Sequence, residues 1–168
     1  PLPLGGGRQR AVLAMLLLSA NRVVPRERLI SGLWGDQPPE TAVATVQTYV
    51  SRLRKLLPKG ALLTRPPGYV LVVEPGEFDL LCFESLVAES RRLEPAAAAR
   101  LLREALSLWR GEPLADLADV PYVERERRRL EELRLAALEA RVEADLALGR
   151  HAELVPELES LVREHWLR

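Results

Sequence analysis

The chain has 168 residues, which is enough for one ordinary domain or two small ones. About half of the residues are apolar, so a core can be buried, and the abundance of Leu, Ala, Val, Arg and Glu favours helices. The single cysteine, Cys82, excludes an internal disulfide and a cysteine-based zinc site, and it fits a reducing cytoplasm. No apolar run reaches the roughly 20 residues that a membrane span needs, so we expect no membrane partner.

The formal net charge of zero conceals an uneven distribution of charge. Residues 1–75 contain 10 Lys and Arg against 4 Asp and Glu, whereas residues 76–168 contain 14 against 20. A basic half beside an acidic half indicates that only the first half meets a polyanion. The division of charge does not by itself identify that polyanion.

The first third of the chain predicts two helices with tight connections. Residues 1–7 have no helical character and are typical of a loop or the tail of a strand. Residues 8–21 predict an amphipathic helix, and Pro25 can open a short second helix over residues 26–34. No lysine and serine pair follows Gly5-Gly6-Gly7, so we interpret the glycines as a flexible turn and not as a phosphate-binding loop. The expected inward side chains of the first helix are Val12, Leu13, Leu16 and Leu17.

Residues 40–57 predict a helix with two unlike faces. The apolar face has spacings of three and four residues and consists of Val43, Val46, Val50, Leu53 and Leu57. The opposite face carries Thr45, Gln47, Thr48, Ser51, Arg52 and Lys55. After Glu40 the helix contains no acidic residue, which suits contact with phosphates and base edges. The alternative is an ordinary basic amphipathic helix that packs on a partner.

A hairpin is predicted after this helix. Two β-prone runs, residues 62–64 and 69–73, flank Pro66-Pro67-Gly68, and Arg65 lies beside the turn. Three short helices whose third is polar on one face are typical of a helix-turn-helix, and a following hairpin makes it a winged helix.

Three segments of this half resemble a known family. LLSANRVVPRERLISGLWGD, TVQTYVSRLRKLL and TRPPGYVL are similar, in order and spacing, to the DNA-binding half of the Streptomyces antibiotic regulatory protein family, an OmpR-like winged helix. The resemblance implies that residues 40–57 are the recognition helix in the major groove and that Arg65 lies at the wing tip. It also implies a first domain over residues 1–75, whose N-terminal sheet is absent here apart from a remnant at Leu2–Leu4.

From residue 78 onward the periodicity is helical. We expect helices over residues 79–93, 96–109 and 121–148, and a last helix from about His151 to Glu164. Pro156 is unfavourable inside a helix, so we expect the helix proper to begin at Val155 or Pro156. Small residues at the expected helix contacts suggest hairpins like those of tetratricopeptide repeats, with a generic helical bundle as the alternative. These small residues are Ala136, Ala137, Ala140 and Ala144.

The second half also resembles the regulators named above. WRGEPLADLADVPYVERERRRLEELRLAALEARVEADLALGRHAEL is similar to the bacterial transcriptional activator domain that follows their winged helix. The resemblance implies a second domain over residues 76–168, helical and incomplete at its end. The run Glu124–Arg134 alternates bases with acids at helical spacing, which predicts pairing within one helix. A second DNA contact in this run is the alternative.

The sequence shows no arrangement typical of an enzyme. His151 and His165 lie 14 residues apart without a cysteine or acidic grouping at ligand spacing, so we expect no metal site and no cofactor. There is no serine in a nucleophile elbow and no acidic cluster in the basic half. We therefore expect no catalytic residues.

The resulting hypothesis is a cytoplasmic, sequence-specific transcriptional activator. The predicted DNA-binding residues are Thr45, Gln47, Thr48, Ser51, Arg52, Arg54, Lys55 and Arg65. The family resemblance implies binding to direct repeats in double-stranded DNA, recruitment of the RNA polymerase holoenzyme and control of antibiotic gene clusters. Self-association on DNA is a further option. The alternative is a helical interaction scaffold whose winged helix does not bind DNA sequence-specifically.

Overall fold

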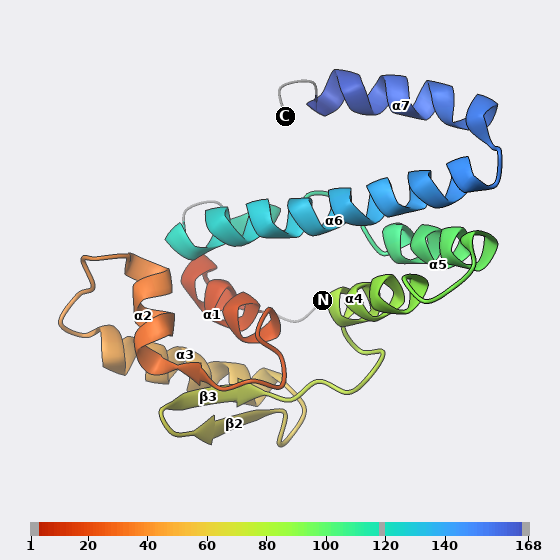
Figure 1. The fold of residues 1–168 in the computed structure, drawn as a ribbon. Coiled ribbons are helices and arrows are strands. Elements are labelled where there is room, and N and C mark those ends of the chain that lie inside the picture. Colours follow the sequence, from red (N-terminus) through yellow and green to blue (C-terminus); the bar gives the residue numbers. More distant parts are fainter. Residues whose placement is uncertain (1–3, 118–119, 166–168) are drawn as a thin grey trace. The chain divides into compact units, whose positions relative to one another are not determined.

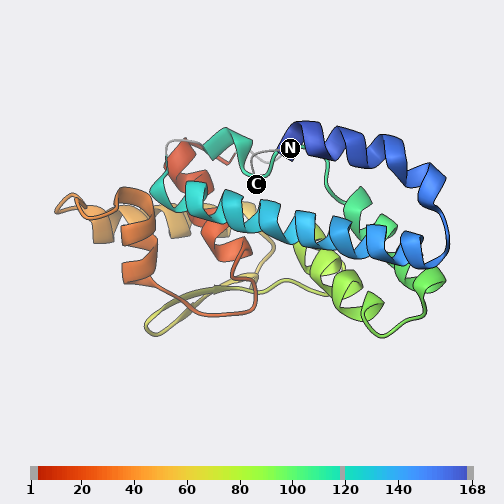
Figure 2. The same cartoon turned by 45° about the horizontal axis from the view of Figure 1, so that its top comes forward.

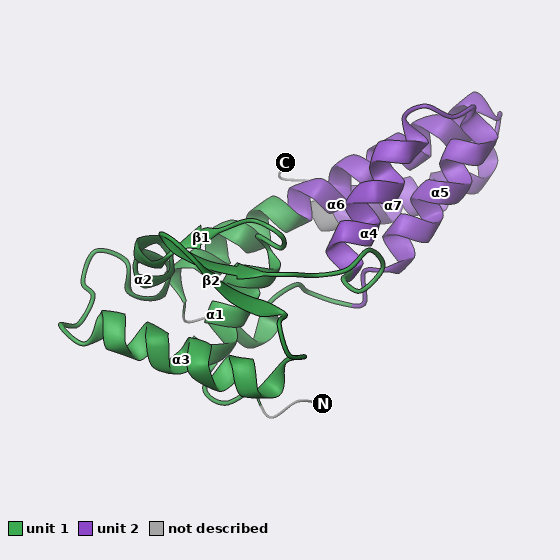
Figure 3. Cartoon of the chain, turned by 90° about the horizontal axis from the view of Figure 1, so that it is seen from below, with its two compact units in different colours: residues 1–78, 111–130 green, residues 79–110, 131–168 purple. Residues whose placement is uncertain are grey.

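The structure, a computed structural model, describes residues 4–117 and 120–165. The remnant strand expected at residues 2–4 therefore falls largely outside the described residues. The chain forms two compact units, which are coloured separately in Figure 3. The first unit contains residues 1–78 and 111–130, and the second contains residues 79–110 and 131–168. The long helix α6 (Pro121–Ala147) contributes to both units.

The first unit is built around helix α1. It runs from Gly7 to Leu17, and all of its residues from Ala11 to Leu16 are buried. The amphipathic helix predicted over residues 8–21 is therefore shorter and more central than expected, and Leu17 is only half-buried. Helix α2 (Arg26–Trp34) has the predicted bounds, and α3 (Ala42–Leu56) is shorter than predicted by two residues at its start and one at its end. Figure 1 shows α1, α2 and α3 beside the small sheet.

The predicted hairpin is present and belongs to a three-stranded antiparallel sheet. Strands β2 (Leu62–Arg65) and β3 (Gly68–Leu71) flank the two-residue turn, and β1 (Val24–Pro25), which we did not predict, pairs with the other edge of β3. A Cβ atom on Gly68 would lie 1.9 Å from the Val24 carbonyl oxygen. Only glycine therefore permits this close approach of β1 to β3.

Asn21 fixes the turn after α1 to the end of the wing. Its φ of 62° lies in the left-handed region, which Asn tolerates better than most residues. Its backbone N–H donates to the Leu71 carbonyl at 2.9 Å, and its side-chain amide exchanges two hydrogen bonds of 3.0 Å with the Val73 backbone. The helix predicted to end at Asn21 thus ends earlier, and Asn21 extends the ladder of the sheet instead.

Helix α3 buries Val46, Val50 and Leu53 as predicted, but its apolar face begins at a different residue. Val43 is 43% exposed, whereas Ala42 is buried, so the prediction that Val43 faces the core was wrong. The buried positions are Ala42, Val46, Val50 and Leu53, and Leu57 is half-buried just beyond the helix. An apolar face that starts at Val43 and one that starts at Ala42 both have spacings of three and four residues. The contacts of α3 with α1 and α2 bury Ala42.

Residues 111–130 complete the core of the first unit. The side chains of Leu117, Val120, Tyr122 and Val123 are buried in the same apolar cluster as those of α1. The 3₁₀ helix η1 (Ala115–Leu117) lies against α1, and Arg10 pairs with Asp116 there at 3.0 Å. A segment that follows two helices of the second unit in sequence is thus part of the interior of the first unit.

The second unit consists of helices α4 (Asp79–Ser90), α5 (Pro95–Ser107), the later part of α6, and α7 (His151–His165). Figure 2 shows these helices from a second side. Helices α4 and α5 form a tightly packed hairpin around Phe83, which meets the Trp109 ring edge-on at a centroid distance of 5.4 Å. The mainly helical fold, a winged helix followed by tetratricopeptide-like hairpins, agrees with the predicted class.

Two details of this unit correct the predictions. Ala136 is exposed, while Ala137 is buried and Ala140 packs against the core, so Ala136 is not a contact residue. Helix α7 begins at His151, as the helical periodicity indicated, and contains Pro156, so the expectation that the helix proper begins at Val155 or Pro156 was wrong. Because Pro156 is the sixth residue of α7, the helix loses one backbone hydrogen bond near its start and continues.

The charged run of α6 forms the predicted pairs within the helix. Arg128 contacts Glu124 at 3.0 Å, and Arg129 contacts Glu126 at 2.7 Å. The run is not entirely solvated, however, because Glu126 is only 7% exposed. Arg127 lies within 3.9 Å of Glu124 and also donates to the Pro113 and Leu114 carbonyls, which holds the segment before α6 in place.

A buried carboxylate links the helices of the second unit. Asp145 is 2% exposed and accepts hydrogen bonds from Arg103, Arg141 and Arg150. Burial alone raises the pKa of Asp145, but these arginines outweigh it and hold the pKa below its ordinary value. Arg141 also pairs with Glu157 of α7, so the cluster joins α5, α6 and α7.

Candidate nucleic-acid interface

The solvent-facing side of α3 gathers most of the predicted DNA-binding residues. Its exposed members line one shallow depression together with Ala44, and they are Gln47, Thr48, Ser51, Arg52 and Lys55. No acidic residue lies in α3, and Arg54 and Lys55 stand in its last turn. The face therefore offers hydrogen-bonding groups and cations without a carboxylate that would repel phosphates.

The two threonines of this set differ in availability. Thr45 is half-buried, so it reaches solvent only in part. The Thr48 hydroxyl donates to the Ala44 carbonyl at 2.9 Å, one turn back in the helix. Thr48 thus keeps its oxygen lone pairs for a partner while its proton is used within α3.

Arg54 connects α3 to the wing. Its Nε donates to the Leu62 carbonyl at 3.0 Å, and its Nη2 donates to the Thr64 hydroxyl at 2.6 Å. Its guanidinium also lies 5.9 Å from the centre of the Tyr69 ring. The structure therefore gives Arg54 a positioning contact within the protein, which its place beside Lys55 in the sequence did not indicate.

Arg65 occupies the last position of β2, directly before the Pro66-Pro67 turn, and its side chain is exposed. It pairs in register with Gly68 across the hairpin. Since Arg54 holds β2 against α3, the wing tip and the α3 face belong to one fixed arrangement. Arg65 is therefore held at a fixed position relative to the exposed face of α3.

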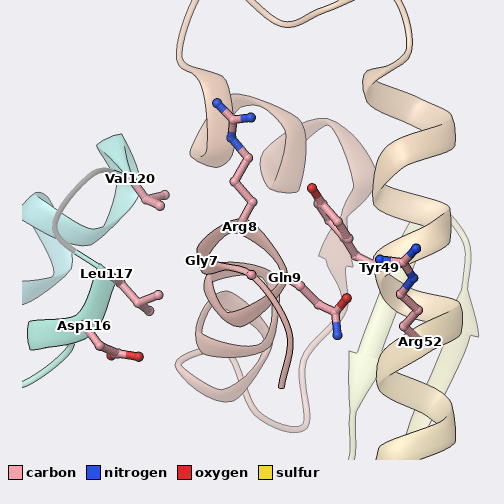
Figure 4. A pocket seen from close by; sticks show the side chains of 9 residues that line it. Gly7, Arg8, Gln9, Tyr49, Arg52, Asp116, Leu117 and Val120 are labelled. Atoms are coloured by element: carbon pink, nitrogen blue, oxygen red, sulfur yellow. The ribbon is translucent and has the colours of Figure 1, made fainter. Parts of the chain in front are cut away.

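A pocket of about 520 Å³ lies beside α3, at the N-terminus of α1 (Figure 4). Its polar lining includes Arg8, Gln9, Tyr49 and Arg52, and Asp116 stands at its edge. Arg8, Gln9 and Tyr49 were absent from the predicted set. The Gly5-Gly6-Gly7 run was the signal for this pocket, but the sequence did not show that it leads into the first turn of a helix beside Arg52.

The distribution of charge matches the two units. The first unit holds 14 Lys and Arg against 10 Asp and Glu, and the second holds 10 against 14. Within the described part of the chain, no group of His, Cys, Asp and Glu side chains is suited to a metal ion. In the same part, no helix is long and apolar enough to span a membrane.

The first unit has three helices, α1 to α3, of which α1 is buried, and a hairpin wing. Together with the acid-free basic face of α3, these features define a winged helix-turn-helix DNA-binding domain. Comparison with protein families finds two matches along the chain. Residues 4–71 match the family described as "Transcriptional regulatory protein, C terminal", and residues 78–168 match "Bacterial transcriptional activator domain". The chain belongs to the Streptomyces antibiotic regulatory protein family, in which these two domains occur together.

Individual relatives match nearly the whole length of the chain. Regulatory protein AfsR of Streptomyces griseus is 41% identical over 98% of the chain, and Regulatory protein DnrI of Streptomyces peucetius is 41% identical over 94%. The structure of Mycobacterium tuberculosis EmbR in complex with a low affinity phosphopeptide is 40% identical and covers 100% of the chain with a TM-score of 0.92. The chain spans 17% of AfsR, 64% of DnrI and 47% of that EmbR chain.

These findings decide between the classes that the sequence left open. The chain belongs to a family of DNA-binding transcriptional regulators. This membership disfavours the alternative of a helical interaction scaffold whose winged helix does not bind DNA. The matches do not assign roles to individual side chains.

Proposed function

We propose that this protein is a sequence-specific transcriptional activator of a secondary-metabolite gene cluster, such as one for an antibiotic. The observation that carries the proposal is the acid-free exposed face of α3, which offers Gln47, Thr48 and Ser51 beside Arg52 and Lys55. Such a combination suits a helix in the major groove, where amides and hydroxyls contact base edges and cations contact phosphates. Membership of a family of antibiotic regulators supports the choice of target genes.

The roles of the side chains follow from their availability. We assign base contacts to Gln47, Thr48 and Ser51, with Thr45 at the margin of the face because it is half-buried. Arg52 and Lys55 contact backbone phosphates, and Arg65 contacts the neighbouring minor groove from the wing tip. Arg54 acts mainly by holding the wing against α3, and its remaining Nη1 is free to reach a phosphate.

The two halves have separate tasks in this proposal. The winged helix within residues 1–75 binds DNA, and residues 111–130 complete its core. The remaining helices of residues 76–168 act as the activator domain, which contacts the RNA polymerase holoenzyme in the cytoplasm. Binding to direct repeats places two copies side by side with the same orientation, and self-association then involves unlike surfaces of neighbouring copies.

The test is footprinting followed by transcription in vitro. Duplexes selected from fragmented genomic DNA are footprinted with the purified chain, and we expect protection of two directly repeated elements near a promoter. Adding the chain to RNA polymerase holoenzyme on that template should then increase the transcript. Protection without repeats, or repeats without any increase in transcript, would contradict the respective part of the proposal.

A further inference from the structure

The N-terminus of α1 exposes backbone donors without a cap from the protein. Gly6 is the N-cap residue, makes no side-chain capping bond, and is followed by a first turn without an acidic residue. The first N–H groups of a helix have no partner within the helix, and the helix dipole makes this end attractive for anions. A Cβ atom on Gly6 or Gly7 would meet nothing within 4 Å, so the approach to these amides is open.

Gln9 is a second and independent sign of a ligand in this pocket. Its side chain is 4% exposed, and its amide lines the pocket between α1 and α3 (Figure 4). Among the described residues, no hydrogen-bond partner accounts for this amide. An amide that faces a pocket without a protein partner keeps its donor and its acceptor available to a ligand there.

The charges of the pocket favour an anion. Arg8 makes a cation–π contact with Trp34 at 5.7 Å. Neither Arg8 nor Arg52, which both line the pocket, has an acidic partner among the described side chains. Asp116 is the acidic member of the lining, but Arg10 pairs with it at 3.0 Å. Two guanidinium groups, an amide and helix N–H groups together form a binding site typical of phosphate.

Arg52 shows which phosphate would reach this site. It lines both the pocket and the depression on the exposed face of α3. We propose that the pocket at the α1 N-terminus holds one phosphate of the DNA backbone, on a strand that borders the groove entered by α3. This inference rests on the proposed function, and it adds Arg8, Gln9 and the α1 amides to the DNA contacts.

The first test measures how DNA affinity depends on salt for the full chain, with random duplexes and with a selected duplex. Arg8→Gln should weaken binding to both and reduce the slope of log K against log salt by about 1, as expected for one lost phosphate contact. Arg22→Gln is the matched control, because Arg22 is an exposed arginine in the turn beyond the other end of α1. Its slope should equal that of the wild type.

A second pair of variants separates the site from the stability of the fold. Gly6→Asp places a carboxylate at the N-cap, where Asp stabilises helices, so the melting temperature should stay the same or rise. The same carboxylate occupies the α1 amides and repels a phosphate. Gly6→Asn has the same shape without the charge, so Gly6→Asp should bind both duplexes more weakly than Gly6→Asn.

The outcomes distinguish the possible failures. Wild-type affinity with an unchanged slope in Arg8→Gln would overturn the pocket assignment and leave the proposed function intact. If inorganic phosphate raised the melting temperature of the wild type but not of Arg8→Gln, and the DNA slope were unchanged, the site would serve a free anion. A wild-type chain that did not bind DNA at all would overturn both the proposed function and this inference.

Discussion

Gln47 is exposed, and its side chain can make two hydrogen bonds to one base. It lies in the depression of α3, and no hydrogen bond within the described part of the chain occupies its amide. Glutamine recognises adenine in the major groove through a donor and an acceptor on neighbouring atoms. Its position one turn before Ser51 places it along the line of the proposed base contacts.

Gln47→Ala should therefore relax specificity at one base pair and cost about 1–3 kcal/mol there. The measurement is a competition series in which each position of a selected duplex is replaced in turn. Gln37→Ala is a matched control, since Gln37 is an exposed glutamine outside α3. Unchanged preferences at every position would show that Gln47 does not face the bases.

Arg54 and Lys55 are adjacent cations with different contacts. Arg54→Gln removes the hydrogen bonds to the Leu62 carbonyl and the Thr64 hydroxyl, so we expect the free energy of unfolding to fall by about 1–2 kcal/mol. Lys55→Gln should leave the stability unchanged and lower the salt slope of DNA binding by about 1. Urea denaturation and salt titrations of both variants check this, and equal stabilities would contradict the positioning role.

The side chains of α3 also show how much of the candidate site the sequence could predict. The exposed polar face of α3 followed from helical periodicity, because residue type and spacing alone place side chains around a helix. The ties of Arg54 to the wing and of Thr48 to Ala44 depend on rotamers and on a strand ten residues away. Such contacts leave no periodic trace in a sequence.

The helices and strands also differ in how well the sequence predicts them. Helix α2 has the predicted bounds because Pro25 and Gly35 mark its ends locally, and the hairpin follows from its Pro66-Pro67-Gly68 turn. Strand β1 has two residues and exists only through its pairing with β3, so local propensity could not reveal it. Packing against α1 and α2 likewise determines that Ala42, and not Val43, is buried at the start of α3.

The arginine cluster around Asp145 makes the second unit sensitive to acid. Because the folded pKa of Asp145 lies below its ordinary value of 3.8, its contribution is complete above that value and is lost as the pH falls through the lower folded pKa. Asp145→Asn should lower the free energy of unfolding by about 3 kcal/mol at pH 7, because three arginines lose their buried partner.

Thermal unfolding between pH 7 and pH 3 measures this effect. The difference between the wild type and Asp145→Asn should be constant at neutral pH and shrink below about pH 4. Glu143→Gln, at an exposed acid on the same helix, should behave like the wild type at neutral pH. A difference that grew on acidification would have the wrong sign for a lowered pKa.

At the scale of the whole molecule, the DNA-binding unit is discontinuous in sequence. The charge division and the family motifs indicated a boundary near residue 75, and nothing in the sequence indicated that residues 111–130 pack beside α1. That packing depends on four buried side chains far along the chain: Leu117, Val120, Tyr122 and Val123. Long-range burial of this kind has no local signal.

A fragment of residues 1–78 should therefore be largely unfolded. Removing four buried apolar side chains withdraws about 5–10 kcal/mol, which is comparable to the total stability of an ordinary domain. Circular dichroism and amide proton dispersion of the fragment, compared with the whole chain, measure this. A fragment that melts cooperatively near the temperature of the whole chain would contradict the structural role of residues 111–130.

The central claim is that the α3 face recognises a DNA sequence, and fluorescence anisotropy tests it most directly. The whole chain is titrated into a selected genomic duplex and into random duplexes at two salt concentrations. We predict binding to both that weakens with salt, with an affinity for the selected duplex at least about 10³-fold higher. Equal, weak affinity for every duplex at both salt concentrations would contradict sequence-specific recognition by this chain.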